Sequence, residues 1–292
     1  MSLRITPLTD PVDGAHSRRL AWLASDADSN PVGTAFLRLF DGGQDHLAEL
    51  TLHVHPVERR KGVGSRLLDA AVAAARDNAR RCVMAQAPAE SPGDNFLPAR
   101  GFRKVLTMRF ARLPLADVDT TALTKIIEKP HSDYRLASWH GTVPDTLAQT
   151  FAASRRAMDD MPMDDADYGT AAWDVDRVRA AAKAVAERGD DLHTVVAIDT
   201  RDDSIAGFTE LVVPGQGTGD GQHYGTGVLP EHRGHGLGRW MKAESIRQAH
   251  ERYPDLGGLL TDTADSNTHM RHISDSLGYM PTHTTRQYQL DL

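Results

Sequence analysis

The sequence predicts an α/β protein made of two related domains in tandem. One reason is an internal repeat, in which the nine residues 56–64 (PVERRKGVG) recur 174 positions later at 230–238 (PEHRGHGLG). A second reason is that each copy follows an extended segment and precedes a helical one. Two matched local contexts indicate duplication of a whole supersecondary unit.

The segment before the first copy has the pattern of a half-buried strand, because Leu50, Leu52 and Val54 alternate with polar residues. After the first copy, apolar residues recur at three- and four-residue steps, which predicts an amphipathic helix. The second copy follows HYGTGVLP and precedes another segment with helical spacing, which Pro254 ends. Each copy is therefore expected to form a strand, a glycine-bearing turn and a helix.

The remaining elements follow from the same patterns. In the first half, strands are expected at 4–7, 18–24, 32–40, 81–85 and 104–113, with no helix before the glycine turn. In the second half, strands are expected at 134–139, 194–198, 205–213, 223–229, 258–261 and 284–290, and helices from 144, across 173–187 and from 267. The predicted domains are 1–113 and 133–292, joined by a linker at 114–132 that has room for a short helical turn.

Composition limits the possible partners. The chain has 292 residues, 40% of them apolar and 25% charged, which is typical of a globular protein. Its net charge is -7, and no lysine- or arginine-rich block is present, so nucleic acid is not an expected partner. Mild acidity suits a cationic substrate.

The sequence also predicts a cytoplasmic location. No run approaches the ~18 apolar residues of a membrane span, so no membrane partner is expected. The first residues, MSLRITPLTD, lack the features of a secretory signal. Cys82 is the single cysteine, which excludes an intramolecular disulfide and favours a reducing compartment.

The glycine turns suggest a phosphate-binding site. A helix N-terminus leaves backbone N–H groups unpaired and carries partial positive charge, so it attracts phosphate oxygens. Gly236 and Gly238, or Gly62 and Gly64, would let a pyrophosphate approach the backbone, while an arginine in each turn adds charge. Neither the dinucleotide-binding pattern G-x-G-x-x-G nor the Walker pattern G-K-S/T fits these segments.

At these residues the sequence resembles the GNAT superfamily of acyl-CoA-dependent N-acyltransferases, in the tandem, mycothiol synthase-like type. The family signature Q/R-x-x-G-x-G/A after a V-x-P strand end is matched by VLPEHRGHGLG at 228–238 and by VHPVERRKGVG at 54–64. A second element, an asparagine helix ending in a Gly-aromatic pair, matches Asn267 through Gly278-Tyr279. In the first half only Arg100-Gly101-Phe102 remains of it.

The resemblance implies a mixed, mostly antiparallel sheet in each domain, splayed where acetyl-CoA binds and flanked by helices. The strand before each turn would bind the pantetheine arm through its backbone, and the turn would hold the pyrophosphate. The residues implied in the second half are Thr226, Gly227, Val228, Arg233, Gly234, His235, Gly236, Leu237, Gly238 and Asn267. Those in the first half are Leu52, His53, Val54, Arg59, Arg60, Lys61, Gly62, Val63 and Gly64.

Transfer of an acyl group to an amine requires a base near the strand before the turn and a proton donor near sulfur. Glu49 lies on that strand in the first half, and His223 is its counterpart at the 174-residue offset. Glu210 on a neighbouring strand is a further candidate base, and Tyr224 a candidate donor. The family's usual tyrosine donor is replaced by Ser274 in the second half and by Leu97 in the first.

Helices between the first and second strands usually wall the acceptor pocket in this family, and only the second half has them. They bracket an acidic stretch that we expect to favour a small-molecule amine, cationic in character, unless it is simply a solvated loop: Asp159, Asp160, Asp164, Asp165 and Asp167. His232 with His235, and His269 with His272, are each three residues apart. No metal site is predicted, because a third ligand is missing.

Two function classes follow from these observations. The first is an enzyme that moves an acetyl or other short acyl group from CoA to a small-molecule amine by direct attack, with the second domain the active one. The alternative is a non-catalytic acyl-CoA-binding regulator or interaction scaffold, which the missing tyrosines and the short first half favour. Neither class fixes the oligomeric state or the number of domains that bind acyl-CoA.

Overall fold

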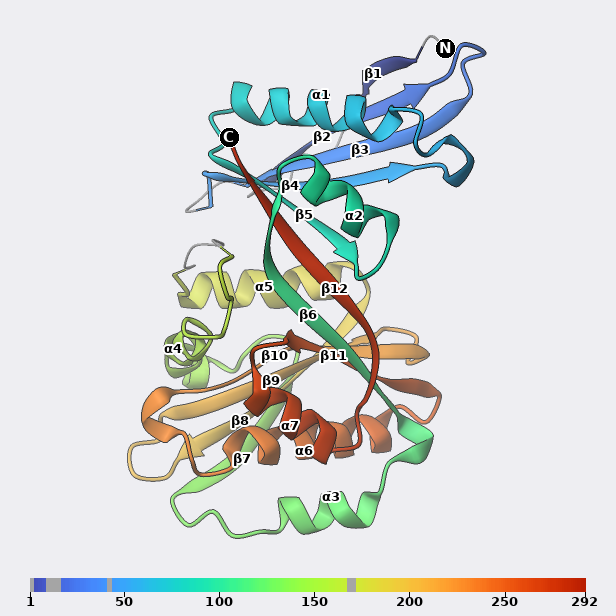
Figure 1. Cartoon of the computed structure of the whole chain (residues 1–292). Helices are drawn as coiled ribbons and strands as arrows, with labels where there is room; N and C mark the ends of the chain where they lie inside the picture. Colours follow the sequence, from blue (N-terminus) through green and yellow to red (C-terminus); the bar gives the residue numbers. More distant parts are fainter. Residues whose placement is uncertain (1–2, 9–16, 41–43, 167–171) are drawn as a thin grey trace. The chain divides into compact units, whose positions relative to one another are not determined.

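The computed structural model describes residues 3–8, 17–40, 44–166 and 172–292, which hold twelve strands and seven α-helices (Figure 1). These residues divide into two compact units. Unit 1 comprises Met1–Met108, Met163–Ala171 and Thr284–Leu292, and unit 2 comprises Arg109–Pro162 and Ala172–His283. Each unit contains one copy of the sequence repeat.

Unit 1 is a mixed sheet covered on one face by the helix after the first glycine turn. It contains β1 (Arg4–Leu8), β2 (Ser17–Ser25), β3 (Pro31–Phe40), β4 (Leu47–Val54) and β5 (Cys82–Pro88), with η1 (Pro56–Glu58), α1 (Val63–Asp77) and α2 (Pro92–Ala99). Neighbouring strands are antiparallel from β1 to β4, and β4 is parallel to β5. Leu37 and Leu50 of the sheet share a core with Leu67 of α1.

Unit 2 has helices on both faces of its sheet. It contains η2 (Leu115–Asp117), α3 (Thr120–Ile127), β7 (Tyr134–His140), α4 (Asp145–Ser154), η3 (Arg155–Met158), α5 (Val175–Glu187), β8 (Asp190–Asp199), β9 (Ile205–Pro214), β10 (Gly219–Val228), η4 (Pro230–His232), α6 (Leu237–Arg252), β11 (Leu256–Ala264) and α7 (Thr268–Ser276). Leu211 packs with α6 and α7, whereas Phe208 packs with α4 and α5. Because β9 is covered on both faces, nine of its ten residues are buried and its sequence is nearly all apolar.

In both units the two parallel strands separate part-way along. The β4–β5 pairing ends at Leu50 with Ala85, although β4 continues to Val54. The β10–β11 pairing ends at Gln222 with Leu260, although β10 continues to Val228. Among the described residues, the backbone groups of each strand end thus have no strand partner on that side, as the splayed sheet implied by the resemblance requires.

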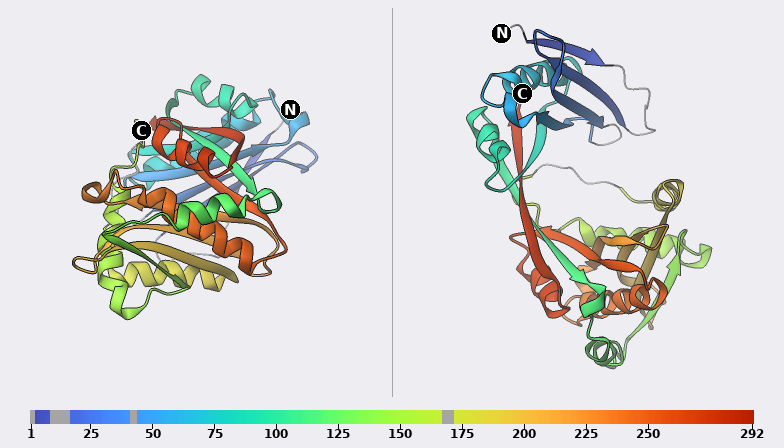
Figure 2. Two further views of the ribbon diagram at one scale, coloured as in Figure 1. Left: turned by 90° about the horizontal axis from the view of Figure 1, so that it is seen from below. Right: turned by 90° about the vertical axis from the view of Figure 1, so that its right-hand side faces the viewer.

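The last strand of each repeat belongs partly to the other unit. β6 (Arg103–Pro114) leaves unit 1 and ends beside β11 in unit 2, while β12 (Met280–Asp291) leaves unit 2 and ends beside β5 in unit 1. The strand order is β1-β2-β3-β4-β5-β12 in the sheet of unit 1 and β6-β11-β10-β9-β8-β7 in the sheet of unit 2. Figure 2 shows the two units from two further directions, each with its own helices against its sheet. The segment 284–290, expected to complete the second domain, therefore completes the sheet of unit 1.

The α/β class and the tandem repeat are confirmed, and the differences are local. Segment 114–132, expected to be a linker with a short helical turn, contains η2 and the eight-residue helix α3, which packs on α6. A helix not expected from the sequence, α2, begins after Ser91, whose side chain accepts a hydrogen bond from the N–H of Asp94, with Pro92 in the first turn. None of the described helices is long and apolar enough to cross a membrane.

Candidate active site

The turn between β10 and α6 is built around two glycines in the left-handed region. Gly234 has φ of 85° and Gly236 has φ of 76°, which side-chain-bearing residues rarely adopt. A Cβ built on Gly234 would meet nothing within 4 Å, and one on Gly236 would meet only the His131 ring at 3.9 Å. The space beside both glycines is therefore open to a ligand.

The first turn of α6 exposes its backbone amides. Gly236 is the N-cap residue and no side chain of the described residues caps it, while the first bonded amide after it is that of Trp240, which donates to the Gly236 carbonyl. Leu237, at 1% exposure, anchors the helix through its side chain and not through its N–H. Unpaired amides at the positive end of a 16-residue helix bind phosphate oxygens, so the turn fits a pyrophosphate.

Unit 1 repeats this arrangement with one difference. Gly62 is the N-cap residue of α1, with φ of 83°, no capping side chain and open space at its Cβ position. Where unit 2 has Gly234, unit 1 has Arg60, held at φ of 65°. A non-glycine residue in this region costs about 1 kcal/mol. The first turn is more basic but more strained than the second.

Both turns contain an arginine whose side chain bonds to the end of the preceding strand. Arg233 Nε donates to the Val228 carbonyl at 3.0 Å, and Arg59 Nε donates to the Val54 carbonyl at 3.3 Å. Each arginine thus ties its turn to the end of the preceding strand. The terminal nitrogens of Arg233 donate to Asp160 at 2.6 and 2.7 Å, so its positive charge is balanced by a carboxylate.

The other residues expected to bind the pantetheine arm lie on the free strand ends. Thr226 Oγ1 is 2.7 Å from Thr209 Oγ1, and a Cβ on Gly227 would come within 3.0 Å of Ala157. Only a glycine at 227 therefore lets η3 pack this closely. Leu52 and Val54 of unit 1 are half-buried, and His53 between them is exposed.

Glu210 is part of a buried ion pair. Its Oε2 accepts a hydrogen bond from Arg155 Nη1 at 2.7 Å, and its Oε1 accepts one from Nη2 at 3.2 Å. The two side chains are 9% and 10% exposed. The Arg155 guanidinium also lies 4.4 Å from the Trp173 ring centroid. A carboxylate bound in this way is not a free base, so its expected role requires the pair to open.

His223 lies on the opposite face of the sheet from Glu210. It is opposite Leu211, which packs with α6, and it is 5% exposed. Neither ring nitrogen has a hydrogen-bond partner among the described residues. Burial, together with the charge of Lys242, holds the pKa of His223 well below its usual value. Glu210 and His223 therefore do not form one site.

A bulge in β10 changes which residues of β4 and β10 correspond to each other in the two repeats. The register shifts between His223 and Gly225, whereas no such shift interrupts β4 opposite β3. Downstream of the bulge the repeat offset is 174, since Val54 and Val228 both lie opposite a glycine. Upstream it is 173, so Glu49 corresponds to Gln222 and not to His223. A constant offset along the sequence does not account for the extra residue in this bulge.

Tyr224 and Glu49 are accessible at the surface. Tyr224 is 54% exposed, and its hydroxyl accepts a hydrogen bond from Arg188 Nη2 at 3.0 Å. Glu49 is exposed on β4, opposite Arg38 of β3. Of the four candidate catalytic residues, Tyr224 and Glu210 share the α4 and α5 face of unit 2, while Glu49 belongs to unit 1.

Comparison with known proteins identifies the chain. The model of the family described as "Acetyltransferase (GNAT) family" matches residues 6–102 and 156–279, one match for each copy of the repeat. The chain belongs to the GNAT acetyltransferase family. It is 26% identical over 286 residues to a mycothiol acetyltransferase of Rhodococcus jostii (strain RHA1), covering 95% of this chain and 85% of that protein.

Two solved structures share this GNAT fold. A tandem GNAT protein from the clavulanic acid biosynthesis pathway, solved without AcCoA, has a TM-score of 0.76 at 23% identity, covering 96% of this chain and 84% of that one. A GCN5-related N-acetyltransferase from Sphaerobacter thermophilus has a TM-score of 0.70 at 15% identity, covering 97% and 82%.

The helix α7 begins after the asparagine of the GNAT pattern and contains the position at which the usual tyrosine is missing. Asn267 caps this helix, because its side chain accepts a hydrogen bond from the N–H of Met270 at 3.1 Å. Ser274, in the expected place of the tyrosine, is buried and accepts a hydrogen bond from Lys242 Nζ at 3.3 Å. In unit 1 the buried Leu97 of α2 holds that place. The donor in this hydrogen bond, Lys242, is 1% exposed and was not predicted as a functional residue.

The carboxylates of the acidic stretch are divided between the two units. Asp160 lies in unit 2 and binds Arg233, whereas the N–H of Asp165 donates to the Val105 carbonyl within unit 1. Asp164 also belongs to unit 1, and Asp167 lies outside the described residues. The chain passes from one unit into the other within this segment, and the expected joint action of these carboxylates on an amine stays a prediction.

A histidine next to the turn belongs to a polar group that the sequence did not reveal. His232 Nδ1 is 3.1 Å from the Tyr134 hydroxyl and 3.8 Å from Asp199, which is itself almost buried. Hydrogen bonds from Arg201 hold the pKa of Asp199 below its usual value. Within the described part of the chain, no three His, Cys, Asp or Glu side chains are placed to hold a metal ion.

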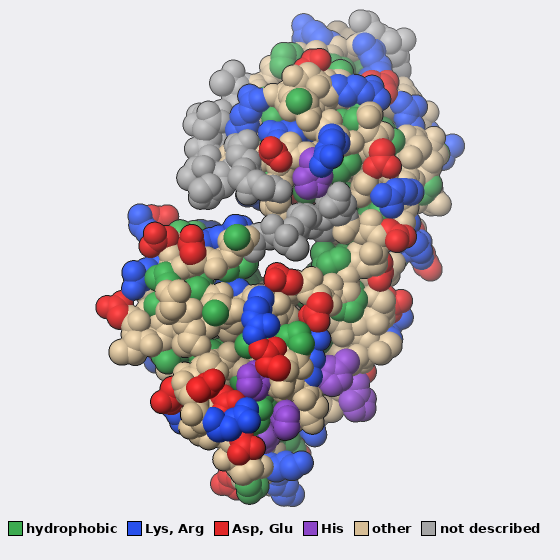
Figure 3. All heavy atoms as spheres, turned by 90° about the vertical axis from the view of Figure 1, so that its left-hand side faces the viewer, with side chains coloured by type: hydrophobic (Ala, Val, Ile, Leu, Met, Phe, Trp, Pro, Cys, Tyr) green, Lys and Arg blue, Asp and Glu red, His purple; other side chains and the backbone are tan. Residues whose placement is uncertain are grey.

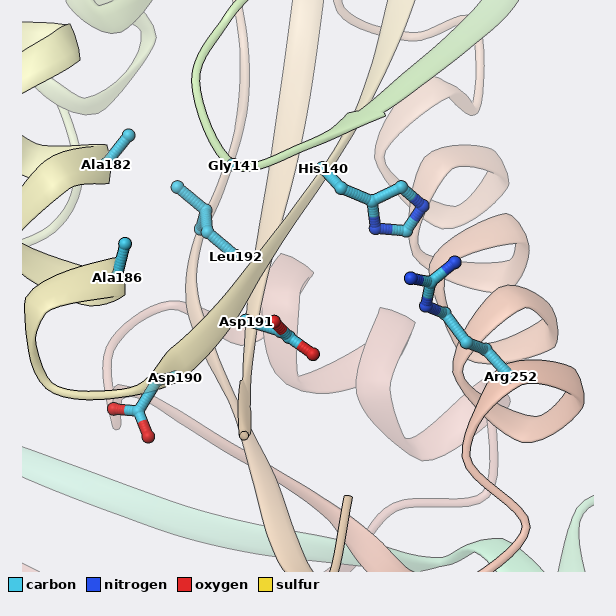
Figure 4. Close-up of a pocket in the computed structure, with 8 residues that line it drawn as sticks. All are labelled: His140, Gly141, Ala182, Ala186, Asp190, Asp191, Leu192 and Arg252. Carbon is cyan, nitrogen blue, oxygen red and sulfur yellow. The ribbon is translucent and has the colours of Figure 1, made fainter. Parts of the chain in front are cut away.

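A small pocket of about 110 Å³ lies at the other end of α6 from the glycine turn. His140 from β7 and Arg252 from α6 point into it from opposite sides, with Asp191 of β8 below them (Figure 4). The α6 helix has 16 residues and is therefore about 24 Å long. The pocket is thus separate from the candidate active site.

Proposed function

We propose that the protein is an N-acyltransferase that moves an acetyl or short acyl group from acyl-CoA to a primary amine of a small molecule by direct attack, with unit 2 carrying the reaction. The main support is the uncapped start of α6 at Gly236, which directly follows a strand that has lost its parallel neighbour. Bound acyl-CoA would supply the activated thioester. The open amides of the turn would hold its pyrophosphate, and the free edge at Thr226 to Val228 would hold the pantetheine arm.

Unit 2 is the better candidate for acceptor binding. Among the described residues, only unit 2 has helices, α4 and α5, before its glycine turn and on the face opposite α6. Tyr224 lies on that side of the strand end, where its hydroxyl accepts a hydrogen bond from Arg188 at the end of α5. A preference for cationic amines would come from carboxylates of the acidic stretch, of which Asp160 is already paired with Arg233. On the face shown in Figure 3, acidic and basic side chains of the described residues are interspersed.

A non-catalytic acyl-CoA-binding protein is the second candidate, and one observation favours it. Glu210 is bound by Arg155 and His223 is buried, so unit 2 presents neither as a free base. The two functions differ in turnover. Release of free thiol from acetyl-CoA with a panel of small-molecule amines supports the enzyme, whereas binding without release across the panel supports the alternative.

The binding step is tested with Gly236→Asp and Gly62→Asp. Aspartate tolerates the left-handed region better than most residues, and its carboxylate would repel phosphate at the open amides. Gly141→Asp is the matched control, because Gly141 also has positive φ, of 65°, and open space at its Cβ position. Calorimetry should show acetyl-CoA binding lost at the changed turn and kept in the control. Equal binding by all variants would contradict the proposal.

A further inference from the structure

Lys242 lies in the middle of α6 with its amine inside unit 2. Nζ donates hydrogen bonds to Thr261 Oγ1 at 3.0 Å and to Ser274 Oγ at 3.3 Å, and it lies 4.7 Å from the centre of the Tyr279 ring. A buried ammonium normally requires a carboxylate partner. Here its hydrogen-bond partners are hydroxyl groups, which can pass a proton on. Burial lowers the pKa of Lys242 to about 7, so the amine both holds and releases a proton near neutral pH.

The amine lies where β10 and β11 part. Thr261 comes one residue after Leu260, the last residue of β11 paired with β10, and His223 comes one residue after Gln222, the partner of Leu260. Lys242 contacts Thr261 directly, and its charge acts on His223. If pyrophosphate binds at Gly236, a pantetheine arm that follows β10 back from Val228 brings its sulfur end towards this apex.

Unused hydrogen-bonding groups surround the same point. Both ring nitrogens of His223 and the hydroxyl of Tyr279 are buried and have no partner among the described residues. The two rings are 6.2 Å apart between centroids. Buried polar groups are nearly always hydrogen-bonded, so three unpaired atoms at one place indicate that a ligand atom or water belongs there.

We propose that Lys242 returns a proton to the coenzyme A sulfur, through the Ser274 hydroxyl, when the thioester breaks. This inference rests on the proposed function. The acceptor nitrogen forms its bond to the acyl carbon, and the carbon–sulfur bond breaks with its electron pair on sulfur. Sulfur takes the Ser274 hydroxyl proton, and Ser274 takes one from the Lys242 ammonium. The proton lost by the acceptor nitrogen then restores Lys242 through solvent, so the products are an amide and a free thiol.

The other titratable groups near the amine are few. Asp262 of β11 raises the proton affinity of Lys242, and its Oδ1 accepts a hydrogen bond from Gln222 Nε2 at 3.0 Å. His223 faces the amine from β10, and Tyr279 follows α7. The expected pH effects of a change at Lys242 therefore include these three groups.

The test compares coenzyme A with desulfo-coenzyme A, which lacks the sulfur, so no acceptor is needed. Calorimetry is carried out on the full chain carrying Gly62→Asp, so that only the turn of unit 2 is available. An ammonium connected to sulfur should lower the pKa of the bound thiol by about one unit, so coenzyme A should gain affinity relative to the desulfo compound, up to about tenfold, as the pH rises through the pKa of the thiol. Ultraviolet difference absorbance between the two complexes follows the thiolate directly.

Lys242→Met should remove this preference and the thiol shift while leaving affinity for desulfo-coenzyme A unchanged. Ser274→Ala keeps the lysine, interrupts the relay and should give the same result, and it decides the question if Lys242→Met does not fold. Lys183→Met, at an exposed lysine paired with Glu187, is the control and should behave as the parent. Equal losses for both compounds would show a purely structural lysine and overturn the inference. Failure of the parent to bind either compound would instead overturn the proposed function, and the inference with it.

Discussion

Arg233 and Asp160 form a bidentate ion pair beside the glycine turn, with nitrogen–oxygen distances of 2.6 and 2.7 Å. Hydrogen bonding to Arg233 lowers the pKa of Asp160, so the carboxylate is ionised at neutral pH. A phosphate ligand at Gly236 therefore meets a turn whose arginine is already balanced by a negative charge.

Asp160→Asn should tighten coenzyme A binding in unit 2. Removal of one negative charge beside the pyrophosphate site is worth about two- to fivefold in affinity, because both side chains are half exposed and screened by solvent. The gain should shrink as salt is raised from 0.01 to about 0.2 M. Calorimetry in the Gly62→Asp background measures it. Asp203→Asn, which removes the exposed partner of Arg135, is the control. A gain that does not respond to salt would argue against an electrostatic cause.

The Arg155 and Glu210 pair should dominate the stability of the α4 face. Glu210→Ala leaves a buried guanidinium without its carboxylate, and we expect the free energy of unfolding in urea to fall by about 3–5 kcal/mol. Replacing both residues together with methionine should recover most of this loss, because no charge is then left buried.

The exposed pair of Arg179 and Asp145 provides the comparison for this experiment. Asp145 is 94% exposed, so Asp145→Ala should cost less than about 1 kcal/mol. If Glu210→Ala proved equally mild, the pair would have to open readily. Glu210 would then become a stronger candidate for the base that accepts the amine proton.

The sequence predicted the glycine turns because their function depends on the backbone. Gly62 and Gly236 are recognisable as residues that allow positive φ, and the strand and helix on either side have clear periodicity. The partners of Glu210 and Arg233 were not predictable in this way. Arg155 and Asp160 come from a segment more than fifty residues away, and only the packing of η3 against the sheet brings them close.

The bulge in β10 shows a different limit. One additional residue between Gln222 and Gly225 reverses which face each side chain takes, and the alternation of polar and apolar residues is too short there to reveal it. Lys242 was missed for a related reason. A lysine on a helix is usually solvated, and nothing in its neighbours along the chain indicates that Thr261 and Ser274 enclose it.

His193 should make the protein less stable in mild acid. Burial lowers the pKa of His193 to about 4, with further lowering by His140 and Arg252 and a smaller opposing effect of Asp191. Below its unfolded pKa of about 6.5, the unfolded chain binds a proton that the folded chain does not. The stability that the neutral His193 contributes to the folded protein is therefore complete above about pH 6.5. It is lost between pH 6.5 and 4, by an amount on the order of 3 kcal/mol.

Urea unfolding of His193→Gln across this pH range measures the effect. Glutamine keeps a donor for the Tyr253 hydroxyl, which lies 2.5 Å from His193 Nε2 and itself donates to Asp191. The slope of stability against pH should be smaller in this variant than in the parent. His269→Gln, at an exposed histidine of α7, should leave the slope unchanged. Parallel slopes for all three proteins would show that His193 does not titrate on unfolding.

Tyr288 on β12 should contribute more to the stability of unit 1 than to that of unit 2, although β12 is the last strand of the second repeat. Its ring is 3% exposed in the core that also holds Leu67 of α1, and its hydroxyl hydrogen-bonds the buried carboxylate of Asp94 on α2. Tyr288→Ala should therefore cost about 3–5 kcal/mol, as for other large aromatic residues removed from a core.

The part of the structure that is destabilised by Tyr288→Ala shows which sheet contains β12. It distinguishes a β12 that completes the sheet of unit 1 from a β12 that stays in the sheet of its own repeat. Tyr288 pairs with Ala85, so Tyr288→Ala should speed amide hydrogen exchange in β5 and leave β9 protected, because β9 belongs to unit 2. Thr282→Ala, at an exposed residue of β12 within unit 2, should change neither strand. Faster exchange in β9 with β5 unaffected would place the strand in the sheet of its own repeat. Faster exchange in β5 alone would mean that unit 1 completes its sheet only after the end of the chain has been made.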